Sequence, residues 1–536
     1  MRYGPRASHA RSPFLCLLSS FMVSFIGSLL RAVPGPLRRA EQGKRAPLTT
    51  QRTLLRDLLR TAAGTKWGQR FDFAAIADAP DVVAAFQERV PLHQWEDICD
   101  DAARVRDGVP DVFWPGRTTN FAVSSGTTSE GKVMPISDAT IAHNRSFSLG
   151  VGMNYLVETG HWQFLLGKHL TIPGTLDEDP ERPGVLAGEV SGILAEHAPG
   201  FFRTLFQAVS DDVLDEPNWR RKLEAIADRA MDQDIRLMVM VPSWAASLFH
   251  ILIERYNARH DTNVQTVGEI WPNLQVFISG GVALDSYREL LQELIGLPRL
   301  DFVETYGASE GFFAFQNEVH DPALLLHTNA GVFYEFVRMD ELSSANPTRY
   351  TLETIETGVR YATFVSNASG LWAYQVGDVV RFTQKDPYKI VVAGRTSEMI
   401  DKYGEALFGE EAREALYHAC QQTRTHFSEF HLAPLLADTD RTPAHQWLVE
   451  FETPPDDLSA FADLIDSYLL EANRHYRIRR EGDALATPEV VSVPPGTFHT
   501  WLRQAHETVS SQTKMPRMSE ERHTADGILD LARNNA

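Results

Sequence analysis

The chain has 536 residues, of which 43% are hydrophobic and 23% are charged, and its formal net charge is −20. This length predicts at least two domains with their own cores, and the composition is that of a globular protein. The acidic balance argues against nucleic acid as a main partner, because a phosphate backbone requires a basic face. The three cysteines are too few and too scattered for a disulfide framework or a zinc site: Cys16, Cys99 and Cys420.

The first 47 residues read as an N-terminal extension and linker in which a basic segment precedes an apolar one. Residues 1–12 carry three arginines, and residues 13–30 carry no charge. This order is typical of a secretory signal and is nearly long enough for a membrane span, but helically spaced serines also fit a helix packed on the domain. We expect the packed helix, translation from Met22 and a cytoplasmic protein; membrane association through residues 13–30 stays open as the alternative.

Two helices are predicted before the first motif with chemical content. Leucines at positions 54, 55, 58 and 59 fall on one side of a helix over residues 51–63. Residues 81–89 form a second predicted helix. Neither segment contains a pattern that indicates catalysis.

Residues 121–136 contain the first motif with a chemical interpretation. An apolar run, residues 121–123, predicts the end of a buried strand, and small, hydroxylated and basic residues follow it: Ser124, Ser125, Gly126, Thr127, Thr128 and Lys132. Small side chains let backbone N–H groups surround a phosphate, while hydroxyls add donors and the lysine adds positive charge. The pattern predicts a phosphate-binding loop that differs from the P-loop sequence; a Ser/Thr-rich surface turn is the alternative.

Buried strands alternate with helices in the middle of the chain. Apolar runs predict three strands, with a helix over residues 245–256 between the first two: residues 235–241, 274–279 and 300–305. This alternation predicts a mostly parallel α/β sheet, in which ligands lie beyond the carboxyl ends of the strands. Gly280, Gly281 and residues 306–311 fall at such ends.

The third strand leads into a candidate nucleotide segment: Tyr306, Gly307, Ala308, Ser309 and Glu310. A turn of small residues lets a planar base approach the backbone, and Tyr306 offers a face for stacking. Glu310 offers a hard oxygen ligand for a magnesium ion that bridges ATP phosphates. The alternative is a strand-to-helix turn in which Ser309 is an N-cap and Glu310 lies in the first helical turn.

Two later segments add further candidates. Asp378 follows Gly377 and can accept two hydrogen bonds from a ribose diol, although Gly-Asp is also hairpin chemistry. Residues 332–337 form an aromatic-rich strand whose Glu335 we interpret as structural. Arg395 follows a glycine and precedes a polar turn, a pattern similar to the hinge between the two domains of adenylate-forming enzymes. This likeness implies a domain boundary between residues 384 and 396.

The C-terminal part mixes helices with short strands and predicts a small α+β domain. The predicted helices cover residues 409–422 and 457–475, and the predicted strands cover residues 446–452 and 488–493. Lys514 lies near the end of this part, within Gln-Thr-Lys-Met-Pro-Arg. A lysine on a lid can bring positive charge to a transferring phosphate, whereas an isolated lysine would be read as an exposed tail residue.

These motifs, in this order, resemble those of the adenylate-forming enzymes and most closely those of the GH3 family of acyl acid amido synthetases. The resemblance covers about residues 50–520. It departs from the family pattern at Gln375, where plant members usually have arginine, and at Ser397, where many relatives have aspartate. At these two positions the resemblance therefore implies no role for this chain.

The resemblance implies a large N-terminal α/β domain over residues 48–390, with mostly parallel sheets of the adenylate-forming type, and a small α+β lid over residues 391–536. It implies ATP and Mg²⁺ as cofactors, Lys514 and Glu310 as catalytic residues, and Glu310 as the metal ligand. The implied nucleotide-binding residues are Ser124, Ser125, Gly126, Thr127, Thr128, Lys132, Gly280, Gly281, Tyr306, Gly307, Ala308, Ser309, Asp378 and Arg395.

The implied reaction has two steps. A small carboxylic acid attacks ATP to give an acyl-adenylate and pyrophosphate, and an amino acid amine then displaces AMP to form an amide. The alternatives are a ligase that uses the thiol of coenzyme A, a membrane-anchored protein with a degenerate nucleotide site, and a binding module without turnover. The sequence names neither the acid nor the amine, and a monomer is expected.

Overall fold

The computed structural model describes most of the chain beyond residue 46. The described residues are 47–124, 132–198, 200–216, 218–281, 284, 287–329, 331–396, 398–400, 402–403, 405, 407–435, 442–505 and 515–535. Four subjects of prediction lie outside them: the extension before residue 47, loop residues 125–131, Ser397 and Lys514. Across the described ranges, none of the helices combines the length and apolar character that crossing a bilayer requires.

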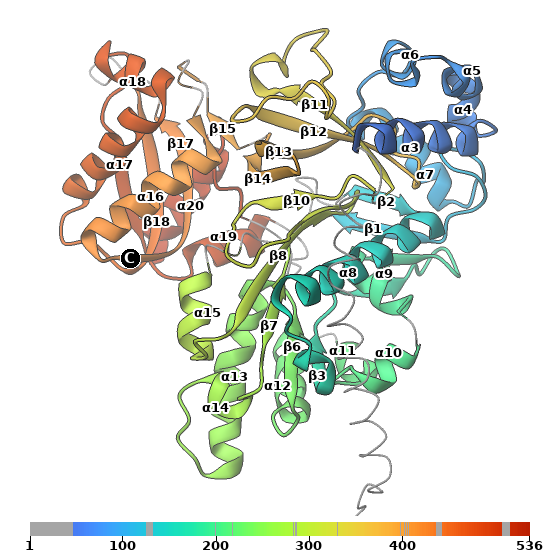
Figure 1. Cartoon of the computed structure of the whole chain (residues 1–536). Helices are drawn as coiled ribbons and strands as arrows, with labels where there is room; N and C mark the ends of the chain where they lie inside the picture. The colour runs from blue at the N-terminus through green and yellow to red at the C-terminus, as the bar shows by residue number, and fades with distance from the viewer. Residues whose placement is uncertain are drawn as a thin grey trace, which may run out of the picture.

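A ten-stranded sheet forms the centre of the large domain (Figure 1), with the order β11-β12-β13-β14-β10-β9-β8-β7-β6-β3. Its parallel part consists of β3 (Lys168–Thr171), β6 (Ile235–Val239), β7 (Val276–Ser279) and β8 (Asp301–Ala308). The remaining strands pair antiparallel: β9 (Gly311–Gln316), β10 (Leu324–Leu326), β11 (Val332–Arg338), β12 (Arg360–Asn367), β13 (Tyr374–Lys385) and β14 (Tyr388–Arg395).

The α/β class is confirmed, but the prediction of a mostly parallel sheet is wrong beyond β8. Only two residues separate β8 from β9, and two separate β13 from β14. Parallel neighbours need a crossover of a dozen or more residues, so connections this short impose hairpins. The sheet is therefore mixed, with its parallel part at one end.

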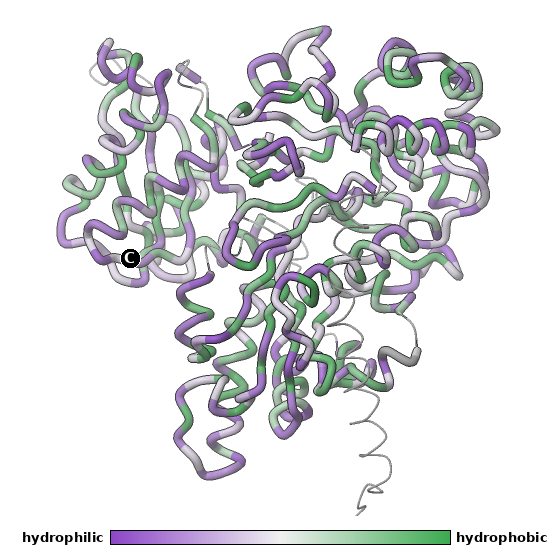
Figure 2. The backbone as a smooth tube through the Cα atoms, in the orientation of Figure 1, coloured by the Kyte–Doolittle hydropathy of each residue, from purple (hydrophilic) through white to green (hydrophobic). Residues whose placement is uncertain are grey.

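Helices cover both faces of the parallel part, as the apolar strands predict. Leu237, Val276 and Val303 face α8 (Asp138–Thr159), where Phe147 and Val151 pack on them. Residues next to these in each strand point to the opposite face, where α12 (Trp219–Ala230), α13 (Pro242–His260), α14 (Val267–Ile270) and α15 (Arg288–Ile295) lie. Hydrophobic residues, green in Figure 2, recur along these central strands.

A second, four-stranded sheet has the order β2-β1-β5-β4 and carries the predicted phosphate loop. Its strands are β1 (Asn120–Ser124), β2 (Lys132–Ile136), β4 (Leu176–Glu178) and β5 (Leu186–Gly188). Short helices follow it in the chain: α9 (Val190–Glu196), α10 (Gly200–Leu205) and α11 (Asp211–Leu214). Single turns of 3₁₀ helix lie at Gln163–Leu166 and Met339–Glu341.

The first described residues form helices that pack as a group beside the large sheet (Figure 1). They are α3 (Pro47–Ala62), α4 (Lys66–Arg70), α5 (Phe73–Asp78), α6 (Val82–Arg89) and α7 (Trp95–Arg106), so both predicted helices are confirmed within a few residues. Leu55 and Leu59 in α3 are completely buried. Trp67 and Phe73 complete this core from the next two helices.

The outer edge of β11, the last strand of the large sheet, is occupied by two groups. The Gln51 side chain donates to the Val332 carbonyl (2.8 Å) and accepts from the Tyr334 N–H (2.9 Å). The Tyr350 backbone then exchanges two hydrogen bonds with Phe336 (2.7 and 2.8 Å). A buried amide of α3 thus mimics a neighbouring strand along the first half of this edge.

The C-terminal domain is a three-stranded sheet between two helical layers. Its strands are β17 (His426–Leu435), β18 (Ala444–Thr453) and β19 (Glu489–Val493), in that order. Leu432 and Trp447 face α16 (Gly409–Thr423) and α17 (Leu458–Ala472), whereas Ala433 and Leu448 face α19 (Thr497–Ala505) and α20 (His523–Asn535). The small strands β15 (Met399–Ile400) and β16 (Leu407–Phe408) precede them.

The predicted helix over residues 457–475 is two helices in the structure. Asn473 ends α17 and is also the N-cap of α18 (Arg474–Glu481), because its side chain accepts a hydrogen bond from the Tyr476 N–H (2.9 Å). Asparagine is a strong N-cap residue, since its side-chain oxygen can bind an N–H of the first helical turn. The predicted α+β character of this part is otherwise confirmed.

Candidate active site

The predicted phosphate loop is the connection of a β-hairpin. β1 pairs antiparallel with β2, and Ser124 lies directly opposite Lys132. Phe121 and Ala122 are fully buried, which confirms the predicted buried strand. The two ends of the loop are therefore held side by side, while Ser125, Gly126, Thr127 and Thr128 themselves lie outside the described residues.

The segment after the third predicted strand is a tight hairpin, so the strand-to-helix alternative is wrong and the turn is shorter than predicted. Tyr306, Gly307 and Ala308 are the last residues of β8, and Ser309 and Glu310 connect it directly to β9. The strand continues because β9 supplies a partner for its backbone. No helix follows, so Ser309 is not an N-cap.

Gly307 is required by packing. A Cβ atom at this position would lie 2.1 Å from Cδ1 of Phe312, on the opposite strand of the hairpin. The Tyr306 ring, which was expected to be available for stacking, is only 8% exposed and packs against Phe313 at a centroid distance of 5.2 Å. The chemical contribution of Tyr306 is instead its hydroxyl group.

Tyr306 and Arg395 both bind Asp378. The Tyr306 hydroxyl donates to Asp378 Oδ2 (3.0 Å), and Arg395 Nε lies 3.5 Å from Asp378 Oδ1. Asp378 does not occupy a hairpin turn, because it lies within β13 opposite Arg395 of β14. Gly377, the residue before Asp378 in the strand, has a φ of +90°. A residue with a side chain rarely adopts this conformation.

Glu310 lies beside this group and is 6% exposed. Burial raises its pKa from 4.5 to about 7, and the negative charge of Asp378 adds to the rise, while the charges of Lys132 and Arg395 oppose it. A negative charge close to a buried carboxyl group disfavours ionisation of that group, here Glu310. The arrangement therefore favours a cation near Glu310.

Asn367 positions the backbone of Glu310, a role that the sequence analysis did not predict. Its side chain donates to the Glu310 carbonyl (2.7 Å) and accepts from the backbone N–H groups of Ser369 (2.9 Å) and Leu371 (3.3 Å). The Asn-Ala-Ser-Gly segment reads as an ordinary turn, in which asparagine binds its own backbone. Nothing in that pattern indicates the distant contact with Glu310.

Gly280 and Gly281 follow β7 and lie beside the end of β8. A Cβ atom at Gly280 would be 2.7 Å from Thr305 Oγ1, and Gly281 has a φ of +81°. Thr305 Oγ1 donates to the Ser279 carbonyl (2.8 Å), which joins the two strand ends. Gly280 and Gly281 therefore lie at the carboxyl ends of parallel strands, where a ligand site is expected.

Glu335 has the contacts of a structural residue. It is 1% exposed, and Arg349 binds it with two nitrogen atoms at 2.8 and 2.9 Å. Gln87 of α6 donates a further hydrogen bond to it (3.0 Å). This network joins β11 to the N-terminal helices and lies within the core of the fold.

The C-terminal segment that follows the position of Lys514 is attached to β17. Leu432 of β17 donates to the Arg517 carbonyl (2.8 Å) and accepts from the Ser519 N–H (3.0 Å). Arg517 Nε lies 3.3 Å from Glu429 Oε1. Tyr287 belongs to the large domain. Burial raises the pKa of its hydroxyl group, and the charge of Glu429 raises it further, so the Glu429–Arg517 ion pair lies close to that domain.

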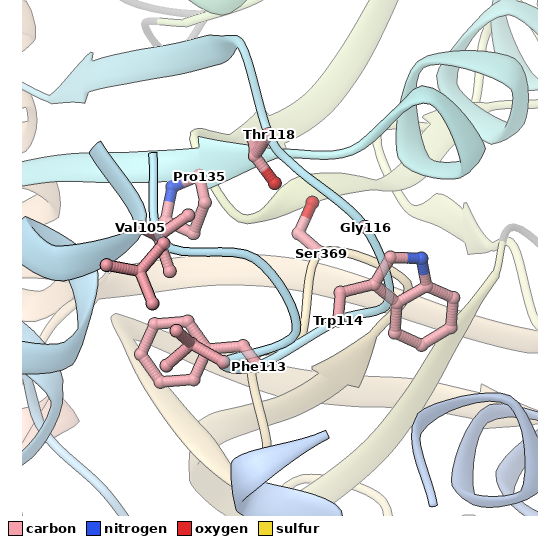
Figure 3. Close-up of a pocket in the computed structure, with 9 residues that line it drawn as sticks. Val105, Phe113, Trp114, Gly116, Thr118, Pro135 and Ser369 are labelled. Atoms are coloured by element: carbon pink, nitrogen blue, oxygen red, sulfur yellow. The ribbon is translucent and has the colours of Figure 1, made fainter. Parts of the chain in front are cut away.

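A small recess lies behind the β1–β2 hairpin (Figure 3). Most of the side chains that line it are apolar, and they include Phe113, Trp114 and Pro135. The Ser369 hydroxyl already donates to Thr140 Oγ1 (2.8 Å). The recess therefore offers packing surface and no spare polar group at Ser369.

Three sequence profiles of one family match the chain. They are the GH3 family N-terminal domain over residues 36–215, the GH3 family central domain over residues 325–395 and the GH3 family C-terminal domain over residues 410–523. Together they cover more than half of the chain.

Individual relatives agree with the profiles. The chain is 23% identical to the indole-3-acetic acid-amido synthetase GH3.3 of Arabidopsis thaliana over 562 residues, which cover 90% of this chain and 91% of that protein. It is 24% identical over 411 residues to GH3.4, an indole-3-acetic acid-amido synthetase of the same plant, and this match covers 65% of this chain and 66% of the relative.

Solved structures define the fold. The structure is similar to that of the GH3.15 acyl acid amido synthetase, with a TM-score of 0.72 and 16% identity over 90% of this chain and 93% of that one. It is also similar to 2-hydroxyisobutyryl-CoA ligase, with a TM-score of 0.52 and 12% identity over 90% and 91% of the two chains. The fold is that of the adenylate-forming ligases. Within that class, the chain belongs to the GH3 family.

Proposed function

We propose that this protein is an acyl acid amido synthetase. It activates a small carboxylic acid with ATP and Mg²⁺ as an acyl-adenylate, and then transfers the acyl group to the amine of an amino acid, with release of AMP. The observation that carries this proposal is the buried Glu310–Asp378 pair, with Lys132 and Arg395 around it, in a chain of the GH3 family. The amido synthetase names of the relatives favour an amine acceptor.

The contacts of Asp378 suit a nucleotide. With one oxygen bound by Tyr306 and the other near Arg395, its carboxylate is fixed in orientation and keeps lone pairs for the two hydroxyl groups of a ribose. Lys132 at the base of the phosphate loop supplies positive charge to the phosphate groups. Lys514 of the lid adds charge where negative charge develops in the transition state.

The residues present fit a magnesium ion bound together with ATP. Glu310 supplies a hard oxygen ligand, and burial raises its pKa although the charges of Lys132 and Arg395 oppose the rise. No group of three or more candidate ligands occurs in the described part of the chain. This agrees with the usual Mg²⁺ site, in which one or two carboxylates act with substrate phosphates and water. When bound, the ion would neutralise phosphate charge.

The decisive experiment is pyrophosphate release measured over a panel of carboxylic acids, followed by AMP release with amino acids or coenzyme A as acceptor. We expect acid-dependent pyrophosphate release, and AMP release that amino acids accelerate. Acceleration by coenzyme A alone would replace this proposal with an acyl-CoA ligase. Absence of ATP turnover with every acid, in protein that still binds ATP, would favour a binding module.

We also propose a cytoplasmic monomer whose lid begins after Arg395. The need for ATP favours a cytoplasmic location. The boundary is placed after Arg395 because β14 continues within the large sheet to this residue, and a boundary at residues 390/391 would cut the strand. Cell fractionation and light scattering test location and oligomeric state. Limited proteolysis that cuts first between residues 396 and 407 would support the boundary, and a first cut within β14 would contradict it.

A further inference from the structure

An open cavity of about 270 Å³ lies on the large domain near the end of the sheet formed by β3. This volume is far greater than the roughly 15 Å³ that one water molecule requires. Seven residues from α10, the segment after it, α12 and the turn after α12 line the cavity: Arg203, Gln207, Ala208, Val209, Ser210, Arg229 and Gln233. Two of them are arginines and none is acidic, in a chain whose net charge is −20.

Several hydrogen-bond acceptors in this lining are already used. The Gln233 side chain donates to the carbonyls of Ala208 (2.8 Å) and Arg229 (2.5 Å). Lys168 of β3 donates to the carbonyl of Gln207 (3.2 Å). A ligand that depends on donating to these carbonyls would have to compete with existing bonds.

The donors, by contrast, remain available. Among the described residues, the side chains of Gln207, Ser210 and Arg229 make no hydrogen bond or ion pair. Arg203 uses its terminal nitrogens on the Glu196 carbonyl (2.7 Å) and on Asp211 (3.3 Å), but its buried Nε has no partner. An excess of unpaired donors is the pattern that an anion satisfies.

The acidic residues next to Arg229 on the same helix and in the turn after it have other partners. Asp228 forms an ion pair with Arg255 (2.5 Å), and Asp232 lies 3.1 Å from His260 Nε2. The guanidinium group of Arg203 is partly neutralised by Asp211. Of the two arginines that line the cavity, Arg229 is therefore the one whose charge no ion pair offsets among the described residues, and a planar guanidinium matches the geometry of an oxyanion.

The cavity is separate from the nucleotide site. Residues 206–208 pair with His169 of β3, through His169 N–H to the Phe206 carbonyl and Ala208 N–H to the His169 carbonyl (2.7 and 2.8 Å). They extend the sheet beyond its end, whereas Glu310 follows β8, three strands further in. At about 4.8 Å between neighbouring strands, the two places are roughly 19 Å apart.

We propose that this cavity is a binding site for a small phosphate-type oxyanion, inorganic phosphate or pyrophosphate. The anion accepts hydrogen bonds from Arg229, Ser210, Gln207 and the free Nε of Arg203. The proposal uses only the geometry of this cavity, so it stands whether or not the protein has the activity proposed above. If that activity holds, pyrophosphate is a product, and the site offers a means for it to act on the enzyme away from the nucleotide.

The test is calorimetric titration of the full chain with pyrophosphate and, separately, with phosphate, while a non-hydrolysable ATP analogue saturates the nucleotide site. The variant is Arg229→Gln, and the matched control is Arg220→Gln on the same helix, where Arg220 is 79% exposed and pairs with Glu224. We expect one bound anion in the parent and affinity about tenfold or more weaker in Arg229→Gln, since a charged hydrogen bond is lost. The control should bind within about twofold of the parent, because the net charge alone changes.

Ser210→Ala serves as a second variant, chosen because Ser210 is exposed and its side chain makes no capping hydrogen bond to α11. Four results would overturn the proposal: no binding of either anion at millimolar concentration, equal weakening in Arg229→Gln and Arg220→Gln, unchanged affinity in both Ser210→Ala and Arg229→Gln, or binding that is seen without the ATP analogue and lost in its presence. The last result would place the anion in the nucleotide site.

Discussion

Replacement of Glu310 by glutamine should stabilise the ligand-free protein at alkaline pH and abolish most of its activity. Burial raises the pKa of this carboxyl group from 4.5 to about 7 in the folded state. The folded state therefore binds a proton that the unfolded state releases, and the free energy of unfolding falls as the pH rises from about 4.5 through 7. Glutamine resembles the neutral carboxylic acid and carries no such penalty.

The magnitude follows from the size of the shift. A rise from 4.5 to about 7 corresponds to roughly 3 kcal/mol, at about 1.4 kcal/mol for each pKa unit. We expect parent and Glu310→Gln to differ little in stability at pH 4.5, where both side chains are neutral in the folded state. Above pH 8 the variant should be more stable by up to about 3 kcal/mol, which is an upper value because local relaxation reduces the penalty.

The assay is urea denaturation of both proteins at several pH values without nucleotide, with Glu88→Gln as a control at an exposed position of α6. The same preparations should show acid-dependent pyrophosphate release in the parent and the control, and a large loss in Glu310→Gln. Identical pH profiles for parent and Glu310→Gln would show that Glu310 is ionised without penalty, and would refute the reasoning. A variant that is less stable at every pH would instead indicate that the carboxylate itself stabilises the fold.

Three further changes test other parts of the site and the fold. Asp378→Ala should weaken ATP binding more than binding of the carboxylic acid, because a ribose acceptor is removed, and equal ATP affinity by calorimetry would contradict this role. Lys514→Ala should slow adenylation by about two to three orders of magnitude while the fold persists; unchanged single-turnover pyrophosphate release would exclude the lysine. Arg349→Met should lower the free energy of unfolding by about 3–5 kcal/mol, because Glu335 stays buried without its ion-pair partner, and a denaturation midpoint equal to that of the parent would show that this ion pair does not stabilise the fold.

The parallel part of the sheet could be predicted because its strands carry their own signal. β6, β7 and β8 are apolar runs with helices between them, and the predicted boundaries at their N-terminal ends are within two residues of the observed ones. In the antiparallel part, the aromatic-rich strand predicted over residues 332–337 is confirmed as β11, but the other strands depend on pairing with their neighbours. β8 continues to Ala308 only because β9 folds back on it. From the sequence alone, small residues such as Gly307 and Ala308 fit a turn as well as a strand.

The candidate site could be predicted as a set of residues but not as an arrangement. The motifs contain Tyr306, Glu310, Asp378 and Arg395, and the structure brings all four together. Their contacts join β8 to β13 and β14, which are far apart in the chain, and no local pattern encodes such a contact. Asn367 shows the same limit, because its local sequence indicates only a turn while its side chain holds Glu310 in place.

The covering of the β11 edge has a consequence for how the protein behaves outside its native state. An unpaired edge strand is a template on which another chain can add a strand, and β11 is apolar along most of its length. Gln51 and Tyr350 occupy its outer hydrogen-bonding groups at Val332, Tyr334 and Phe336. Proteolysis that removes α3 would uncover the first half of this edge, and the shortened protein would then be prone to self-association into aggregates.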